Sequence, residues 1–382
     1  MRTVYSLIFI LIVVFLPCCE KAPNISVQDN FERAEAQYKI MLEKLDSFDK
    51  YPRSLEDDSL KLITSSDWTS GFFPGSLWYL YEWTGNENWK EAAQNYTMPL
   101  KDEQYNDSTH DLGFMMYCSF GNAFRLTGNR QYRDVLLQSA QTLISRYNPI
   151  VGCIQSWDWS DQWQYPVIID NMMNLELLFR AAKELGDSTF YSIAVSHADH
   201  TLNNHFREDY STWHVLDYDT TTGKVLSRET HQGYSDESTW SRGQAWALYG
   251  YSMCYRETGY ERYLDQAVGI ADYVMTHENL PEDGVPYWDF NAPDIPDAPR
   301  DASAAAIMCS ALYELYQHSN EKAHRQFADR ICASLSGEKY KGREGFILDH
   351  SVGSKPSDSE VDVPLNYADY YYLEANLRKS EL

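Results

Sequence analysis

Two aspartates are set apart from the other acidic residues by the segments that follow them. Asp111 lies in the sequence HDLGF and Asp170 in IIDNMMN, and each stands at the start of an apolar stretch that predicts a helix. A helix N-terminus has free N–H groups and partial positive charge, so each aspartate could be a simple N-cap. If both helices begin at the same place in the fold, the two carboxylates could instead do acid/base chemistry.

Other polar and aromatic residues stand at the starts of further apolar segments. Arg242 begins one of them, in WSRGQAW, and Trp68 precedes another, in SDWTSGFFPG. Because arginine is unfavourable at a helix N-terminus, we expect Arg242 to have a carboxylate partner, either in the protein or in a ligand. His231 and Gln232 come shortly before it, in HQGY. This composition is typical of an acid/base site for a carbohydrate that carries an acidic group.

Aromatic residues make up 14% of the chain, with 29 Tyr and 11 Trp. In a pocket, their rings offer flat apolar faces to sugars while their polar edges can still form hydrogen bonds. Most of these rings must belong to the core. Five tryptophans in loop-like stretches are harder to explain by burial: Trp157, Trp159, Trp163, Trp213 and Trp240.

The helices that would position these residues alternate between two kinds. A helix that is apolar on all sides must be buried, whereas one with a polar face can lie outside. The predicted inner helices are 75–85, 112–128, 171–186, 243–259, 302–318 and 365–378, and the first four end in a Gly that can form a left-handed C-cap. The predicted outer helices are 29–48, 88–100, 131–147, 189–206, 261–278 and 321–336.

Six inner and six outer helices predict an all-α fold, the (α/α)6 barrel, because repeated units of this kind bury their faces only against neighbours. An open solenoid is the alternative, but the long aromatic loops between outer and inner helices look like the rim of one pocket. The inner helices of a barrel run in the same direction, so Asp111, Asp170 and Arg242 should lie at one mouth. No linker divides the 382 residues, so we expect one catalytic domain over 28–382.

The N-terminal residues predict export. Residues 1–18 have Arg2 followed by an apolar run, which is typical of a signal peptide and too short for a lasting membrane span. The sequence LPCC resembles a bacterial lipobox, with Cys19 as the residue to be acylated and Cys18 as the alternative. Residues 19–27 would then be a tether, and the protein would be lipid-anchored in the bacterial envelope, in the periplasm or at the outer membrane. An ordinary signal peptide is the alternative interpretation.

Composition limits the partners and cofactors. The formal charge of −24 argues against nucleic acid and against anionic membrane surfaces, leaving the lipid anchor as the expected membrane contact. The five cysteines beyond the signal show no CxxC spacing, and there is no phosphate-cradling Gly loop and no His/Cys cluster, so neither a metal nor an organic cofactor is expected. The sequence does not predict an oligomeric state.

Several stretches together resemble the unsaturated glucuronyl hydrolases, glycoside hydrolase family 88, in the form of a bacterial lipoprotein. The resemblance covers essentially the whole mature chain and rests on SDWTSGFFPGSLWYLY, HDLGFMMYCSFGNA, IIDNMMNLELLF, HQGYSDESTWSRGQAWALYGY and NYADYYYLEA. A sister family that acts on unsaturated rhamnogalacturonan shares the barrel and both aspartates. It typically begins the fourth inner helix differently, so Gln244 and Ala245 favour the glucuronyl family.

The resemblance implies that the protein removes the 4,5-unsaturated uronic acid that polysaccharide lyases leave at a non-reducing end. Enzymes of this family hydrate the C4=C5 double bond instead of attacking the anomeric carbon. By its position in IIDNMMN, Asp170 would be the general acid/base, and Asp111 would position the substrate and raise the pKa of Asp170 by like-charge proximity. Glycosaminoglycan oligosaccharides are the expected substrates.

The resemblance also implies a set of substrate-binding residues. They are Trp68, His110, Asn148, Trp157, His214, Gln232, Arg242 and Trp246, with Trp68 and Trp246 against the unsaturated ring. Asn148 could simply turn the chain before Pro149, and His214 could belong to a structural hairpin. Residues 351–355, SVGSK, are similar in character to a segment with which some family members accept sulfated sugars, but the spacing differs, and a solvated surface loop is the preferred interpretation.

Other functions remain as alternatives. An unsaturated rhamnogalacturonyl hydrolase is the nearest. A non-catalytic glycan-binding lipoprotein would not explain two aspartates at inner helix starts. An (α/α)6 epimerase or inverting glucosidase would need His pairs or Glu at the rim, which the strongest motifs lack.

Overall fold

The computed structural model of the chain describes residues 25–57 and 59–382. The predicted signal peptide, Cys19 and the rest of the predicted tether up to residue 24 lie outside the described residues. Within them, Ser26 caps the first helix, and its hydroxyl accepts a hydrogen bond from the Asp29 N–H. None of the helices in the described part of the chain is long and apolar enough to cross a membrane.

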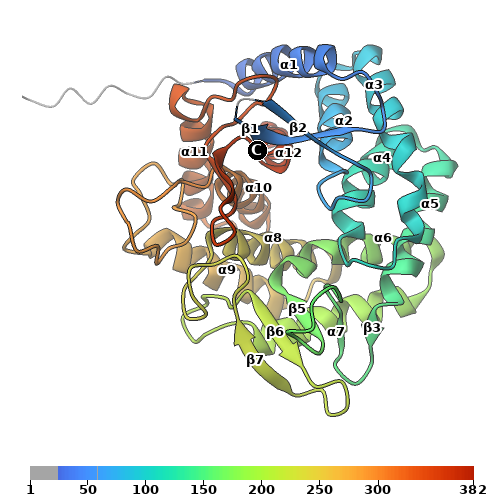
Figure 1. Cartoon of the computed structure of the whole chain (residues 1–382), viewed down its shortest axis with the longest axis vertical. Helices are drawn as coiled ribbons and strands as arrows, with labels where there is room; N and C mark the ends of the chain where they lie inside the picture. The colour runs from blue at the N-terminus through green and yellow to red at the C-terminus, as the bar shows by residue number, and fades with distance from the viewer. Residues whose placement is uncertain (1–24, 58) are drawn as a thin grey trace, which may run out of the picture.

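The helices form a ring of two layers (Figure 1). The outer layer consists of α1 (Val27–Lys44), α3 (Glu87–Thr97), α5 (Arg130–Ile144), α7 (Ser188–Asn204), α9 (Glu261–Thr276) and α11 (Lys322–Ser336). The inner layer consists of α2 (Phe72–Thr84), η2 (Gly113–Gly121) with α4 (Asn122–Thr127), η3 (Ile169–Asn174) with α6 (Leu175–Leu185), α8 (Ser241–Thr258), α10 (Ala302–Ser319) and α12 (Asn366–Ser380). The (α/α)6 barrel with six inner and six outer helices is confirmed.

Burial separates the two layers as the sequence predicts. Every residue of α8 from Ser241 to Cys254 is buried, whereas α3 buries Trp89, Ala93, Tyr96 and Thr97, which recur at helical spacing on one face. The ring is closed because α12, the last inner helix, packs against both α2 and α10. An open solenoid would leave the first and last inner helices apart.

Tight turns connect each inner helix to the following outer helix. Gly85, Gly128, Gly186 and Gly259 end four inner helices with φ between 63° and 68°, as the C-cap prediction requires. Asn320, with φ 58°, does the same at the end of α10. All the long connections therefore lie at the other end of the barrel, where the inner helices begin.

These long connections carry the strands of the fold. Short antiparallel pairs are formed by β1 (Tyr51–Glu56) with β2 (Ser59–Ile63), β3 (Tyr147–Asn148) with β4 (Cys153–Ile154), and β8 (Ser351–Ser354) with β9 (Ser359–Val363). A three-stranded antiparallel sheet has the order β5 (Pro166–Ile168), β6 (Val215–Tyr218), β7 (Val225–Glu229), with Val215 paired to Ile168 and to Glu229. The remaining elements are two 3-10 helices, η1 (Met98–Tyr105) after α3 and η4 (Glu338–Tyr340) after α11.

Two inner helices do not begin as regular α-helix, which the sequence did not predict. The second opens with the π-helical turns of η2 and the third with the 3-10 turns of η3. The two segments approach each other closely. A Cβ on Gly113 would lie 2.4 Å from the Cα of Asn174, and the Asn174 side chain accepts a hydrogen bond from the Phe114 N–H at 3.1 Å. Asp111 comes just before η2 and Asp170 lies in η3, so this contact brings the two aspartates together.

Candidate active site

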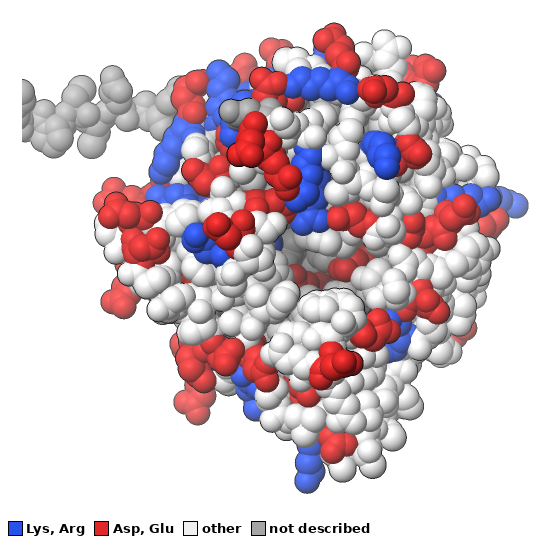
Figure 2. Space-filling model, viewed as in Figure 1, with Lys and Arg blue, Asp and Glu red and all other residues white. Residues whose placement is uncertain are grey.

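A cavity of about 350 Å³ opens at the end of the barrel where the inner helices begin. Figure 2 shows this face of the molecule, hollowed near its middle and surrounded by interspersed acidic and basic side chains. Seven of the ten residues predicted for the catalytic and binding site line the cavity: Trp68, His110, Asp111, Trp157, Asp170, Gln232 and Arg242. Its other lining residues are Phe114, Ile168, Trp159, His231, Ser354, Ser357 and Ser359.

Asp170 is the cavity residue with the most perturbed carboxyl group. It is 8% exposed, and burial raises its pKa to about 7. The positive charge of Arg242 acts to lower the pKa of Asp170, and the negative charge of Asp111 acts to raise it. The predicted like-charge effect is therefore present, but burial is the larger cause. A carboxyl group with such a pKa can both give and take a proton near neutral pH.

Asp111 is held beside Asp170 by local hydrogen bonds. The Thr109 hydroxyl donates to its Oδ2 at 2.7 Å, and Nε2 of His110 lies 3.2 Å from its Oδ1. His110 is buried, and this burial lowers its pKa, so the ring is neutral. A neutral imidazole can donate one hydrogen bond to the carboxylate without neutralising its charge.

His214 lies next to Asp170 on the side away from the cavity. Its Nδ1 accepts hydrogen bonds from the backbone N–H groups of His231 and Gln232, at 3.1 and 3.2 Å. The proton of the neutral ring is therefore on Nε2, which lies 3.6 Å from Oδ2 of Asp170. Burial holds the pKa of His214 well below its usual range, so the ring stays neutral. Its side chain does not line the cavity.

Trp246 is also placed differently from the prediction. Its side chain is fully buried, packed between the rings of Phe114 and Tyr371 with centroids 5.0 and 5.4 Å away, and it does not line the cavity. A sugar ring therefore cannot stack on it in this structure. The indole N–H instead faces Asp170 and acts to lower the pKa of that carboxyl.

Arg242 has the carboxylate partner that its position at a helix start required. The partner is Asp301 of the protein, whose Oδ2 lies 3.2 Å from the guanidinium. The same guanidinium donates to the carbonyls of Val352 and, at 2.6 Å, Gly353, and Gln232 donates to the Gly353 carbonyl at 3.1 Å. Arg242 and Gln232 therefore line the cavity and also hold the β8–β9 hairpin against its wall.

The hairpin corrects the interpretation of SVGSK as a solvated surface loop. Ser351, Val352 and Gly353 are buried in β8, and Ser354 lines the cavity together with Ser357 and Ser359. The resemblance had drawn attention to Ser354 within SVGSK but not to Ser357 and Ser359, and the fold brings all three to the cavity of Asp170 from almost 200 positions further along the chain.

Asn148 does not lie in the cavity. It ends β3, and its side-chain oxygen accepts a hydrogen bond from the Ile150 N–H at 2.8 Å. Its carbonyl accepts another from the Gly152 N–H at 2.7 Å. The side chain thus stabilises a turn, which is the alternative that Pro149 suggested.

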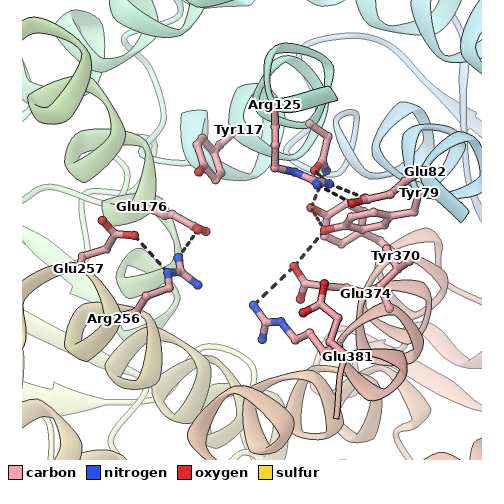
Figure 3. A pocket seen from close by; sticks show the side chains of 14 residues that line it. Tyr79, Glu82, Tyr117, Arg125, Glu176, Arg256, Glu257, Tyr370, Glu374 and Glu381 are labelled. Atoms are coloured by element: carbon pink, nitrogen blue, oxygen red, sulfur yellow. Dashed lines mark hydrogen bonds and ion pairs between the residues drawn. The ribbon is translucent and has the colours of Figure 1, made fainter. Parts of the chain in front are cut away.

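A second cavity, of about 330 Å³, lies toward the opposite end of the barrel (Figure 3). Its charged side chains come from several inner helices and pair with one another. Arg125 forms two hydrogen bonds of 2.5 Å with Glu82, and Arg256 pairs with Glu176 and Glu257. Five glutamates and three arginines line this cavity, and burial raises the pKa of Glu176 to about 7. A raised carboxyl pKa is therefore found at both ends of the barrel, and the cavity of Asp170 differs by its aspartate pair and its tryptophans.

Comparison with known proteins agrees with this geometry. Residues 45–257 match the model of Glycosyl Hydrolase Family 88. An unsaturated glucuronyl hydrolase of Formosa agariphila is 47% identical over 397 aligned positions, covering 100% of this chain and 99% of that protein. An unsaturated chondroitin disaccharide hydrolase of Streptococcus pneumoniae is 34% identical and covers 84% of each chain.

A solved structure is also similar to the protein over most of its length. The crystal structure of an unsaturated glucuronyl hydrolase specific for heparin has 46% sequence identity and a TM-score of 0.91, covering 93% of this chain and 97% of that one. The chain belongs to glycoside hydrolase family 88, and it is a glycoside hydrolase.

Proposed function

We propose that the protein removes the 4,5-unsaturated uronic acid from the non-reducing end of oligosaccharides made by polysaccharide lyases, with glycosaminoglycan products as its substrates. One observation carries the proposal: Asp170 is a buried carboxyl group with a pKa of about 7, placed beside Asp111 at the wall of the cavity. The names of the relatives from Formosa agariphila and Streptococcus pneumoniae support the substrate class.

The reaction is a hydration in which Asp170 acts twice. The protonated carboxyl gives its proton to C4 of the double bond, and the positive charge that forms at C5 is shared with the ring oxygen. Water adds to C5, and the Asp170 carboxylate takes the proton that this water loses. The hemiketal at C5 then opens, leaving a hemiacetal at C1 that expels the remaining sugar as an alcohol. One water is consumed and Asp170 is restored.

Hydration differs from ordinary glycoside hydrolysis, which needs two carboxyl groups flanking the scissile bond. Here one group must be an acid first and a base afterwards, which requires a pKa near the working pH. The Asp111 carboxylate stands close enough to stabilise the positive charge that develops on the sugar ring. His214 and Trp246 act as positioning residues behind Asp170.

The cavity wall suits a sugar ring with a carboxylate. Trp68 and Trp157 bring aromatic rings to the cavity wall, and His110 and Gln232 provide polar groups there. Most of the guanidinium of Arg242 is already bonded to Asp301 and to the hairpin, so its charge acts on a substrate carboxylate mainly at a distance.

The test is turnover of unsaturated chondroitin, hyaluronan and heparin disaccharides, followed by the ultraviolet absorbance of the conjugated double bond. The wild type should consume at least one of them. Asp170→Asn should lose essentially all turnover while keeping its circular dichroism and thermal transition, and substantial activity in this variant would refute the role of Asp170. Turnover of unsaturated rhamnogalacturonan products alone would support the sister activity instead.

We also propose that the enzyme is exported and tethered to the bacterial envelope through acylated Cys19. The apolar run that precedes LPCC supports this proposal. In cells fed a labelled fatty acid, the protein should be labelled and found in the membrane fraction, and Cys19→Ser should abolish both. Labelling that persists in this variant and disappears in Cys18→Ser would move the anchor to Cys18.

A further inference from the structure

Trp159 stands at the cavity with most of its indole in solvent. It is 64% exposed, more than any other large apolar side chain in the described part of the chain. A single exposed apolar residue is common on proteins and needs no explanation by itself. Trp159 differs from such residues because it lines the same cavity as Asp170.

Neighbouring rings hold this indole in place. Trp159 stacks on Trp157, with ring centroids 5.4 Å apart and planes inclined by 29°, and it contacts the ring of His231 at 5.6 Å. His231 in turn contacts Trp157 at 5.7 Å and Trp163 at 6.0 Å. An aromatic ring that is fixed on one face and free on the other is a prepared surface for a sugar ring, since little side-chain freedom remains to be lost on binding.

The exposed fraction of the side chains increases from Asp170 through Trp157 to Trp159, which is the direction in which the rest of a substrate must extend out of the cavity. Asp170 and Trp157 are 8% and 9% exposed, respectively, and Trp159 is 64% exposed. The unsaturated uronate is a chain end and must reach Asp170 with its C4 atom. The rest of the oligosaccharide therefore passes outward, first beside Trp157 and then beside Trp159.

The cavity also offers hydroxyl groups to a sugar that lies on this wall. Ser354, Ser357 and Ser359 belong to the β8–β9 hairpin, which Gln232 and Arg242 fix through the carbonyl of Gly353. An aromatic surface together with hydroxyl groups suits a sugar ring, because the apolar face of the ring can stack while its edge forms hydrogen bonds.

We propose that Trp159 is the platform for the third sugar ring, counted from the unsaturated uronate, so that the enzyme favours tetrasaccharides over disaccharides. This inference rests on the proposed function and goes beyond it by assigning a subsite outside the two rings that flank the scissile bond. Trp159 takes no part in the chemistry and acts on binding alone.

The experiment compares kcat/KM for an unsaturated chondroitin disaccharide and the corresponding tetrasaccharide. Trp159→Ala should lower the value for the tetrasaccharide about tenfold, mainly through KM, and leave the disaccharide within about twofold. Trp159→Phe, which keeps a ring, should recover most of the loss. Tyr105→Ala is the matched control, because Tyr105 is 63% exposed but does not line the cavity.

The possible outcomes separate this inference from the proposed function. Equal losses for both substrates would mean that Trp159 only supports Trp157, and no loss for either would mean that it is an ordinary surface residue; both results overturn the inference. If the wild type consumes no unsaturated disaccharide or tetrasaccharide, the proposed function itself fails. A binding titration with the inactive Asp170→Asn protein provides a second readout. Adding Trp159→Ala to this protein should weaken the binding of the tetrasaccharide about tenfold and leave the binding of the disaccharide almost unchanged.

Discussion

At the scale of single residues, the chemistry depends on how Asp170 is surrounded. Burial raises its pKa to about 7, Asp111 raises it further and Arg242 opposes both. His214 directs an N–H group toward the same carboxyl from outside the cavity. A solvated aspartate would be ionised at neutral pH and could not act as the acid, so the environment creates the catalytic group.

The pH dependence of turnover should report this ionisation. Because Asp170 must be protonated to begin the reaction, kcat/KM should fall as the pH rises through about 7 and decrease about tenfold per unit above that. The measurement is a pH profile of kcat/KM on an unsaturated disaccharide, with enzyme stability checked at each pH. A profile that stays flat from neutral to strongly alkaline pH would contradict Asp170 as the acid.

The same ionisation should affect folding, and its sign can be worked out. The pKa of Asp170 is higher in the folded than in the unfolded state, so its contribution to stability is present at low pH and lost as the pH rises through about 7. Relative to Asp170→Asn, the wild type should lose at most about 3 kcal/mol of unfolding free energy between about pH 5 and about pH 8. Denaturant titrations of both proteins at the two pH values measure this. An equal pH dependence would show that Asp170 is not buried as described.

At the scale of elements, the sequence predicts a good deal of the site but not its details. Apolar segments, four of them ending in Gly, located the inner helices, and the common direction of these helices placed Asp111, Asp170 and Arg242 at one mouth. The irregular starts η2 and η3 could not be predicted, because no local pattern indicated them and their mutual contact joins positions 60 residues apart in the chain.

The rotation of an inner helix about its axis is equally hidden in the sequence. From Ala245 to Tyr255, α8 has only apolar or small residues, so no polar face shows that Trp246 turns into the core while Arg242 reaches the cavity. Ser357 and Ser359 of the β8–β9 hairpin were missed, and SVGSK was taken for a solvated loop, for a related reason. A strand with few apolar residues reads as a loop until its partner and its place in the fold are known.

The contact between η2 and η3 gives a prediction at this scale. Gly113→Ala places a Cβ 2.4 Å from backbone of Asn174, so the two elements must separate. We expect a loss of about 1–3 kcal/mol in unfolding free energy and a fall in kcat of at least about tenfold, as Asp111 moves from Asp170.

Gly121→Ala is the control for this prediction. Gly121 lies in the same η2 element, but the atoms nearest to its new Cβ belong to the side chain of Tyr117, the first of them at 3.0 Å, and not to the backbone of a facing element. Its kcat should stay close to that of the wild type. If Gly113→Ala keeps full activity, the close approach does not set the geometry of the two aspartates.

At the scale of the whole molecule, one end of the barrel holds the candidate active site and the other holds a network of paired charges. Long connections build the cavity where the inner helices begin, and paired charges occupy the second cavity toward the other end (Figure 3). Glu314 on α10 joins this charge network. It holds Arg256 at 2.8 Å and Arg378 at 2.7 Å, and so ties α10 to α8 and α12. Such ties stabilise the ring without taking part in the reaction.

Glu314 should therefore affect stability and leave catalysis unchanged. Burial acts to raise its pKa, but Arg256 and Arg378 outweigh burial and lower it to about 2. Its stabilising effect should be present above about pH 4.5 and be lost as the pH falls toward 2. Glu314→Gln should cost about 3 kcal/mol at neutral pH, measured by denaturant unfolding, with kcat/KM of the folded enzyme unaltered.

The control pair lies nearer the surface. Glu82 and Arg125 are partly exposed, so Glu82→Gln should cost no more than about 1 kcal/mol. If Glu314→Gln has an equally small effect, the network at this end of the barrel does not stabilise the ring as described.

The most direct test of the central claim uses a substrate analogue in which CH₂ replaces the glycosidic oxygen of an unsaturated disaccharide. Attack at the anomeric carbon cannot cleave this analogue, but hydration of its C4=C5 double bond is still possible. We predict that the wild type removes the ultraviolet absorbance of the analogue without separating the two rings, and that Asp170→Asn does not. An analogue that stays intact while the natural disaccharide is consumed would contradict hydration and place the reaction at C1.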